Sequence, residues 1–135
     1  MKTEYCADVI AMFQNRLVLV ERLKFPEGYA LPGGRRDQIG GKLETVRDCA
    51  IREFCEETGL TLVIEGGLGT YDAPGRDPRG PKISTVVYGR AEGTMRDEIG
   101  KTRVFLMDLC DVSKNEYKFV FDHYQIIGDW LRIRK

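Results

Sequence analysis

The stretch from Leu31 to Leu60 constrains the fold more than any other part of the chain. It reads LPGGRRDQIGGKLETVRDCAIREFCEETGL and predicts one short helix over Val46–Thr58. Thr45 can cap the first turn, with Asp48 three residues later completing a capping-box pattern, and Gly59 can end the helix in a left-handed conformation. The chain therefore enters this helix from a glycine-rich loop and leaves it through a glycine.

The predicted helix has one acidic face and one apolar face. Because an α-helix turns about 100° per residue, Glu53, Glu56 and Glu57 fall within one arc of about 100°, and Arg52 lies beside it. Like charges at these spacings destabilise an isolated helix by roughly 0.2–0.5 kcal/mol per pair, and a divalent cation would offset that repulsion. The alternative interpretation is an acidic face in contact with solvent. The opposite side of the helix can be buried and carries Ala50, Ile51, Phe54, Cys55 and Thr58.

The glycines before the helix favour the metal site over the solvated face. Gly33–Gly34 and Gly40–Gly41 predict a tight backbone path beside the helix, where carbonyl oxygens can join a metal ion and amides can approach phosphate. Arg52 can pair with Glu56 one turn later and hold that carboxylate in place. We therefore expect a Mg²⁺ site that also binds substrate phosphates.

This stretch resembles the Nudix box of the Nudix hydrolases. Glu44, followed after seven residues by REFCEETGL (Arg52–Leu60), matches the part of that pattern written R-E-U-x-E-E-x-G-U, in which U is a bulky apolar residue. The glycine that the pattern places six residues before its first glutamate corresponds here to Gln38. The usual glycine pair appears at Gly33–Gly34, so the loop is about four residues longer, which we interpret as an insertion near Asp37–Gly40.

The resemblance covers essentially the whole chain and implies a role for each residue of the box. Glu53, Glu56 and Glu57 would bind Mg²⁺ or Mn²⁺, and Gly34 would lend a backbone carbonyl. In addition, Arg52 would orient a glutamate. Glu44 would be a further metal ligand or would hold the ligands in position without contacting the metal.

The general base of such enzymes is often a carboxylate outside the box. Glu98 and Asp97 are the candidates here, because their loop precedes a strand in the matching region. An exposed polar turn is the alternative interpretation. Lys101 stands where similar enzymes would carry the relevant glutamate.

A second segment indicates the substrate and reads Arg76-Asp77-Pro78-Arg79-Gly80. It resembles a segment typical of the ADP-ribose pyrophosphatase branch, and Phe121–His123 resembles another segment of that branch. Arginines can grip a diphosphate with two hydrogen bonds each. The aspartate between them can accept a ribose hydroxyl, and Arg22, at the end of a predicted strand, is either a further anion-binding residue or a solvated charge. The implied reaction converts ADP-ribose and water into AMP and ribose 5-phosphate.

Three other functions remain open at this stage. A MutT-like nucleoside triphosphate pyrophosphatase suits the short chain. A non-catalytic ADP-ribose sensor is the second, although a regulator of that kind would need a DNA-binding module for which no sequence remains. A structural domain with a fortuitous acidic helix is the third.

Composition narrows the class of protein. The 135 residues predict a single domain over 1–135, and 21 basic residues balance 21 acidic ones, so no overall field attracts nucleic acid or membrane. Four cysteines without a C-x-x-C pair indicate reduced thiols, and hence a cytoplasmic protein. There is no apolar run near 18 residues and no signal-peptide pattern. By resemblance a homodimer is one of the expected assemblies, although the sequence shows no interface signature.

The remaining elements predict an α/β fold, a Nudix-like α/β/α sandwich with a mixed β-sheet. A final helix over about 123–133 follows Asp122 as its cap, and His123 at its start is expected to be structural rather than catalytic. Phe54 and its neighbours place the catalytic helix, about 46–58, against the sheet. The predicted strands are Tyr5–Phe13, Arg16–Arg22, Tyr29–Leu31, Thr61–Ile64, Ile83–Ala91 and Thr102–Met107.

Overall fold

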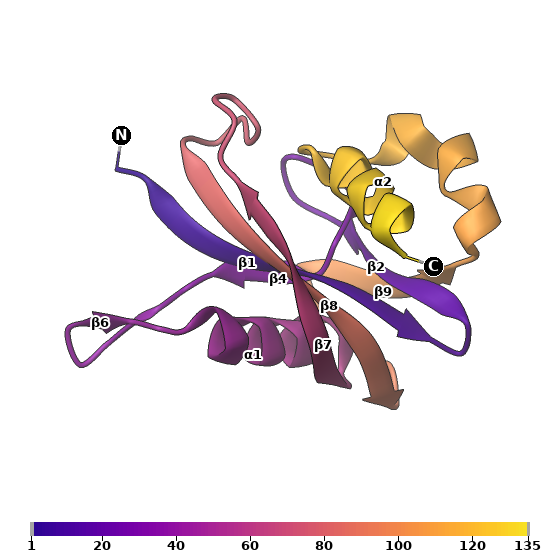
Figure 1. Ribbon diagram of the computed structural model, residues 1–135, viewed down its shortest axis with the longest axis horizontal. Coiled ribbons are helices and arrows are strands. Elements are labelled where there is room, and N and C mark those ends of the chain that lie inside the picture. The colour runs from indigo at the N-terminus through magenta and orange to yellow at the C-terminus, as the bar shows by residue number, and fades with distance from the viewer. Residues whose placement is uncertain (1, 135) are drawn as a thin grey trace.

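The first strand has two apolar faces, and a helix covers each of them. β1 (Glu4–Phe13) buries Ala7 and Val9 on one side and Ile10 on the other, as the alternation of side chains along a strand requires. In the computed structural model, which describes residues 2–134, α1 (Val46–Thr58) packs on the first side and α2 (His123–Ile133) on the second (Figure 1). The predicted α/β/α sandwich is confirmed, and Met1 and Lys135, the ends of the predicted domain, lie outside the described residues.

The sheet is mixed, as predicted. Its main path runs β3-β2-β1-β8-β7, while β4 adds to β1 and β9 adds to β2. β1 and β8 are parallel and the other pairs are antiparallel. The strand predicted over residues 83–91 lies within β8, between β1 and β7. The bounds are β2 (Arg16–Arg22), β3 (Gly28–Ala30), β4 (Gly33–Arg35), β7 (Leu60–Tyr71), β8 (Lys82–Gly93) and β9 (Thr102–Met107). Two 3₁₀ turns, η1 (Leu109–Asp111) and η2 (Ser113–Lys118), precede α2.

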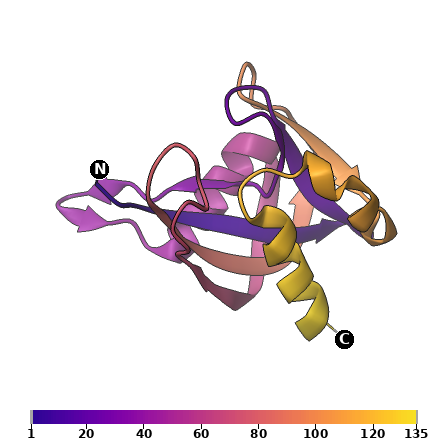
Figure 2. The same ribbon diagram turned by 90° about the horizontal axis from the view of Figure 1, so that it is seen from above.

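The strand after α1 is longer than the sequence predicts. We expected it to end at Ile64 because three glycines follow, yet β7 continues to Tyr71 and pairs with β8 along its length. The pairing register shifts between Ile64 and Gly66 and again between Gly67 and Gly69, so the glycines accompany β-bulges rather than a loop. The long β7–β8 hairpin ends in the 72–81 loop, which lies beside the segment leading into α2 (Figure 2).

The insertion forms a small hairpin of its own. β5 (Gln38–Ile39) pairs with β6 (Lys42–Leu43) across a turn at Gly40 and Gly41, both with positive φ, and it projects from the body at the end of β4 (Figure 1). The expectation that Gly40–Gly41 runs beside α1 is therefore wrong, since no other atom lies within 4 Å of a Cβ built at either glycine. Asp37 and Glu44 close the base of the hairpin through a 2.7 Å hydrogen bond from Glu44 N to Asp37 O.

Both ends of α1 follow their sequence signals. Thr45 Oγ1 accepts a hydrogen bond from Asp48 N at 3.1 Å, and Gly59 ends the helix with φ 76° and donates from its N–H to Cys55 O. Phe54 is fully buried against the sheet, but Cys55 is exposed rather than part of the apolar face. One residue is a rotation of about 100°, which carries Cys55 past the edge of the buried stripe.

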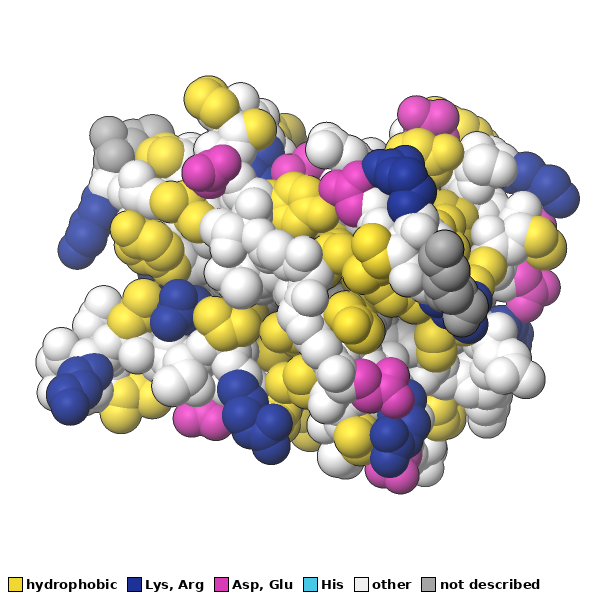
Figure 3. Space-filling view, viewed as in Figure 1, with side chains coloured by type: hydrophobic (Ala, Val, Ile, Leu, Met, Phe, Trp, Pro, Cys, Tyr) yellow, Lys and Arg dark blue, Asp and Glu magenta, His cyan; other side chains and the backbone are white. Residues whose placement is uncertain are grey.

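The surface agrees with the balanced composition. Basic and acidic side chains are interspersed on the face shown in Figure 3. All four cysteines are unpaired, as predicted. Within residues 2–134 no helix combines the length and the apolar character needed to cross a bilayer.

We predict that replacing Gln38–Leu43 by Asn-Gly will shift the midpoint of thermal unfolding by no more than about 4 °C. The replacement leaves Asp37 and Glu44 at the ends of a four-residue turn, so their backbone hydrogen bond can close it. Circular dichroism would measure the midpoint, and a larger drop would mean that the hairpin stabilises the fold.

Gly59→Ala provides the contrast in that experiment. An alanine there would have to adopt φ 76°, and its Cβ would lie 2.8 Å from the backbone nitrogen of Arg96. We expect its midpoint to fall by more than about 4 °C.

Candidate active site

One cavity gathers nearly all of the predicted site residues. It has a volume of about 590 Å³ and lies where α1, β4, the 72–81 loop and the start of α2 meet. Among the predicted residues, Glu44 and Asp97 do not line it. The predicted residues that do are Arg22, Gly34, Arg52, Glu53, Glu56, Glu57, Arg76, Asp77, Arg79 and Glu98.

Glu57 is the most buried of the three helix carboxylates. Its side chain points from α1 toward β4, where Oε1 accepts a 2.6 Å hydrogen bond from Gly33 N. Only 9% of the residue is exposed, and burial raises the pKa of Glu57 well above its usual range. The backbone N–H of Gly33 opposes that rise, and the neighbouring carboxylates of Glu53 and Asp8 add to it.

Gly34 provides the space for a second carboxylate. A Cβ added to Gly34 would overlap the carboxylate of Glu53, so only glycine allows that side chain to lie against β4. Burial is also the main reason that the pKa of Glu53 is raised, to about 7. The carboxylates of Glu53 and Glu57 therefore lie side by side against β4, and burial disfavours the ionised form of each.

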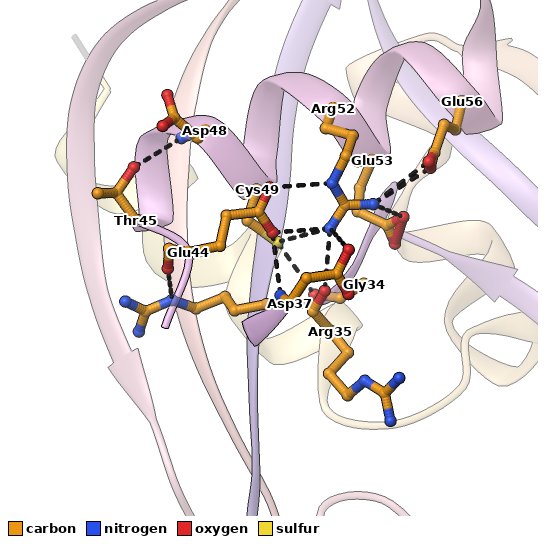
Figure 4. Close-up of polar contacts among 11 residues, drawn as sticks. Gly34, Arg35, Asp37, Glu44, Thr45, Asp48, Cys49, Arg52, Glu53 and Glu56 are labelled. Carbon is orange, nitrogen blue, oxygen red and sulfur yellow. Dashed lines mark hydrogen bonds and ion pairs between the residues drawn. The ribbon is translucent and has the colours of Figure 1, made fainter. Parts of the chain in front are cut away.

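Arg52 holds the acidic cluster together (Figure 4). Its Nε and Nη2 form a bidentate pair with Glu44 at 2.9 and 2.8 Å, and its Nη1 reaches Glu53 at 2.9 Å and Glu56 at 3.2 Å. The predicted i, i+4 pair with Glu56 is therefore present. The hydrogen bonds from Arg52 are the main reason that the pKa of Glu44 is lowered, to about 2.

Glu44 is placed behind the cluster rather than in the cavity. Both of its carboxylate oxygens are engaged by Arg52, and Oε1 also accepts a hydrogen bond from Asp37 N at 3.0 Å. Of the two roles considered for it, metal ligand or support, this geometry favours support of Arg52.

The donor set fits a divalent cation. Hard cations such as Mg²⁺ and Mn²⁺ prefer carboxylate and carbonyl oxygens, and the cavity wall presents Glu53, Glu56 and Glu57 beside the Gly34 backbone. A single arginine faces this cluster from within α1, and its bidentate pair is already with Glu44. A cation at this wall would relieve the repulsion among the remaining carboxylates.

Glu98 reaches the same cavity from the loop before β9. Its Oε2 lies 3.8 Å from Lys101 Nζ, and both residues line the cavity. Asp97 does not line it, because Asp97 Oδ1 accepts a hydrogen bond from Val104 N at 2.9 Å and holds the loop on β9. Of the two base candidates, Glu98 is therefore the one within reach of the site.

All three predicted substrate-binding side chains of the 72–81 loop, Arg76, Asp77 and Arg79, have partners within the protein. Arg76 donates to both carboxylate oxygens of Asp122 at 2.9 and 2.7 Å, so Asp122 ties the loop to α2 instead of capping the helix with its side chain. Asp77 is buried and accepts from the backbone N and the guanidinium of Arg79 at 2.8 to 3.1 Å. Both arginines of the loop therefore have a carboxylate partner, and the Arg76 side chain is 5% exposed whereas that of Arg79 is 38% exposed. The ribose contact of Asp77 and the diphosphate contacts of Arg76 and Arg79 stay predictions.

Arg22 differs from the other arginines of the site. Its guanidinium donates to the carbonyls of Pro26 and Phe25 at 2.8 and 3.4 Å, and it forms no ion pair among residues 2–134. Burial first, and then the positive charge of Arg79, lower the pKa of Arg22. A half-buried cation beside another cation is the arrangement expected of an anion-binding site.

Sequence reasoning missed Asp8, which lies on the cavity floor. It is a buried acid in an otherwise apolar strand, accepts a hydrogen bond from Ser84 and lies 3.6 Å from His123 Nε2. Burial raises its pKa, but the imidazole and the hydroxyl outweigh burial, so the pKa of Asp8 is lowered. A charged residue inside a predicted buried strand was the available signal. His123 Nδ1 accepts from Leu31 N at 2.9 Å, which agrees with the expected structural role.

Comparison with known proteins identifies the family of this fold and cavity. The family model described as NUDIX domain matches residues 3–128. A curated ADP-ribose pyrophosphatase from Methanocaldococcus jannaschii is 37% identical over 128 residues, which cover 93% of this chain and 71% of the relative.

Two solved structures share the fold at lower identity. A bifunctional NMN adenylyltransferase/ADP ribose pyrophosphatase from Francisella tularensis, complexed with AMP and a Mn ion, superposes with a TM-score of 0.83 at 24% identity over 97% of this chain. This chain spans only 42% of that protein. The NUDIX domain of Shewanella oneidensis NrtR, complexed with ADP ribose, gives a TM-score of 0.81 at 23% identity over 98% of this chain and 88% of that one. With the family model matching almost the full length, the chain belongs to the Nudix hydrolase family.

Proposed function

We propose that this protein hydrolyses the pyrophosphate bond of ADP-ribose, giving AMP and ribose 5-phosphate, in a single Nudix domain over 1–135. The observation that carries the proposal is the cavity in which the carboxylates of α1 face the guanidinium groups of Arg22 and Arg79. A diphosphate has the size and charge to bridge two such walls. The 37% identity to a curated ADP-ribose pyrophosphatase supports this choice of substrate.

The metal-binding wall consists of Glu53, Glu56, Glu57 and the carbonyl of Gly34. A Mg²⁺ or Mn²⁺ ion held there would neutralise phosphate oxygens and lower the pKa of a bound water. Gly33 N–H orients Glu57 through its 2.6 Å hydrogen bond. Arg52 orients Glu53 and Glu56 and is itself held by Glu44.

The proton acceptor is assigned to Glu98. It lines the cavity and is partly exposed, and its carboxylate forms no hydrogen bond to the described residues, with Lys101 Nζ 3.8 Å away. A carboxylate so placed can accept a proton from an attacking water if the substrate brings that water within hydrogen-bond reach.

A second enzyme function uses the same metal wall. A MutT-like nucleoside triphosphate pyrophosphatase would share the carboxylates of α1. That function would not explain the ion pair between Arg76 and Asp122, which joins the 72–81 loop to the start of α2. A non-catalytic ADP-ribose sensor would need no metal wall at all. We propose a cytoplasmic protein that acts on a small nucleotide, with a homodimer as one assembly to test by its mass in solution.

We predict that Glu57→Gln will lower kcat for ADP-ribose by at least about 100-fold, because the amide keeps the hydrogen bond to Gly33 but loses the charge that a metal ion requires. AMP release at fixed Mg²⁺ would be measured for ADP-ribose, NADH, a diadenosine polyphosphate and an oxidised guanosine triphosphate. Glu65→Gln, at an exposed glutamate on β7, is the matched control and should retain full activity. Turnover of the triphosphate alone would contradict the ADP-ribose assignment, and binding without turnover would favour the sensor.

Gly34→Ala is expected to weaken Mn²⁺ binding by about 10- to 100-fold, because the new Cβ would displace the Glu53 carboxylate. Mn²⁺ titration followed by electron paramagnetic resonance would give the affinity. Gly67→Ala serves as control, since nothing lies within 4 Å of its added Cβ. Equal affinities for both variants would rule out a metal-binding role for the Gly34–Glu53 contact.

Arg52→Met should lower the free energy of unfolding at pH 7 by about 2 kcal/mol, because the buried carboxylate of Glu44 loses its charged partner. Since the pKa of Glu44 is lowered from 4.5 to about 2, this contribution is complete above pH 4.5 and is lost as the pH falls toward 2. Urea unfolding between pH 7 and pH 3 in a metal chelator would measure the difference between wild type and variant.

The control for this stability series is Arg103→Met, at an exposed arginine 3.9 Å from Glu21. It should change the free energy of unfolding by less than about 0.5 kcal/mol at every pH. If the free energy of unfolding of wild type and Arg52→Met differs by the same amount from pH 7 to pH 3, Glu44 is not the group that Arg52 stabilises.

A further inference from the structure

Phe121 occupies an unusual position at the edge of the cavity. Its backbone has φ 58°, in the left-handed region that large side chains rarely adopt. Its ring lies under two guanidinium groups, with Arg22 Cζ 5.4 Å and Arg79 Cζ 5.3 Å from the ring centroid. All three residues line the cavity that also holds the carboxylates of α1.

The neighbours of Phe121 hold the backbone in this conformation. Val120 N donates to Tyr29 O at 2.9 Å on one side. On the other side the Asp122 carboxylate is bound by Arg76, and the His123 ring accepts a hydrogen bond from Leu31 N. Because both flanks are anchored, the fold maintains a costly φ at Phe121, and such outliers concentrate at functional sites.

The two arginines come from separate parts of the chain. Arg22 ends β2, and Arg79 comes from the 72–81 loop, where Asp77 binds it. Arg22 has no ion pair among residues 2–134. Apart from backbone carbonyls, the aromatic face is the group that places Arg22, and it is shared with Arg79.

We propose that Phe121 is a positioning residue for the diphosphate: its ring holds the guanidinium groups of Arg22 and Arg79 together so that both grip the phosphates opposite the metal-binding wall. The inference rests on the proposed function for the identity of the substrate, but the ligand chemistry it requires is only a diphosphate anion. Two like charges repel each other when no anion is bound, and the negative face of an aromatic ring offsets that repulsion without neutralising the charges. Arg22 has no ion pair among residues 2–134, and Arg79, which Asp77 binds through Nε and Nη2, forms no hydrogen bond through Nη1 to those residues. Each arginine therefore keeps donors for the substrate.

An alternative place for the ring is against the nucleobase. Both guanidinium carbons already lie over the ring at 5.3 to 5.4 Å, so a base that stacked on a face covered by a guanidinium group would have to displace that group. Inorganic pyrophosphate separates the two interpretations, because it has phosphates and no base.

The test compares four variants by calorimetric titration with inorganic pyrophosphate in saturating Mg²⁺. Phe121→Leu removes the aromatic face, and Phe121→Gly removes it while allowing φ 58° without strain. Phe121→Tyr keeps the face. Tyr117→Leu is the matched control, since Tyr117 is exposed and lies outside the cavity, with Lys118 over its ring.

We expect the dissociation constant for pyrophosphate to rise about tenfold in Phe121→Leu and Phe121→Gly, since one cation–π contact corresponds to a factor of about 2 to 30. Phe121→Tyr and Tyr117→Leu should stay within about twofold of wild type. In hydrolysis of ADP-ribose, KM should rise by a similar factor while kcat changes little, because the grip is made in the ground state and the transition state alike. A merely structural role would lower the unfolding midpoint without this separation of KM from kcat.

A double-mutant cycle with Arg22→Met gives the decisive result. If the ring acts through Arg22, the loss of pyrophosphate affinity on Phe121→Leu should shrink at least threefold once Arg22 is gone. Additive losses, a Phe121→Tyr variant as weak as Phe121→Leu, or weaker ADP-ribose binding with unchanged pyrophosphate binding would each overturn the proposal. Because pyrophosphate binding needs no turnover, an inactive wild type would refute the proposed function and leave this inference testable.

Discussion

The hydrogen bond from Gly33 N to Glu57 Oε1 is the contact on which the site depends. It fixes a buried carboxylate against β4, and β4 is held in place because Gly33 and Gly34 pair with Asp8 and Ala7 of β1. Burial disfavours the ionised form of Glu57, and a bound cation would favour that form. The free energy needed for this arrangement comes from the apolar face of the same helix, where Phe54 is fully buried.

The chain carries no net charge, yet its cavity is divided into an acidic and a basic side. Arg52 lies within the acidic side and partly neutralises it, while its bidentate bond with Glu44 keeps it from blocking the cavity. On the basic side, Asp77 and Asp122 hold arginines of the 72–81 loop in place. Each side thus contains a few charges of the opposite sign whose function is to position, and the unbalanced remainder faces the cavity. Local separation of charge, rather than total charge, would attract the proposed metal-bound anion.

The sequence predicts the elements better than it predicts their partners. The bounds of α1 and its cap follow from local signals within one turn, and the two apolar faces of β1 follow from alternation, so helix and sandwich were predictable. The continuation of β7 was not, because a bulge depends on the opposing strand as well as on its own glycines. The Arg76–Asp122 pair joins residues 46 positions apart, and no local pattern distinguishes it from a free arginine. The left-handed backbone of Phe121 depends on anchors on both sides, which only the fold brings together.

The two sides of the cavity are supported by two different cores. The acidic wall is carried by α1, which packs with Phe54 against one face of the sheet. Phe121 comes just before α2, which packs through Ile126 and Ile127 against the other face. The cavity forms where β4 and the end of β2 bring both faces within reach of one ligand. Because each wall has its own core, we expect substitutions around Phe121 to leave the proposed metal-binding carboxylates of α1 in place. The proposed metal site and the proposed anion-binding site are thereby supported from opposite faces of a single sheet.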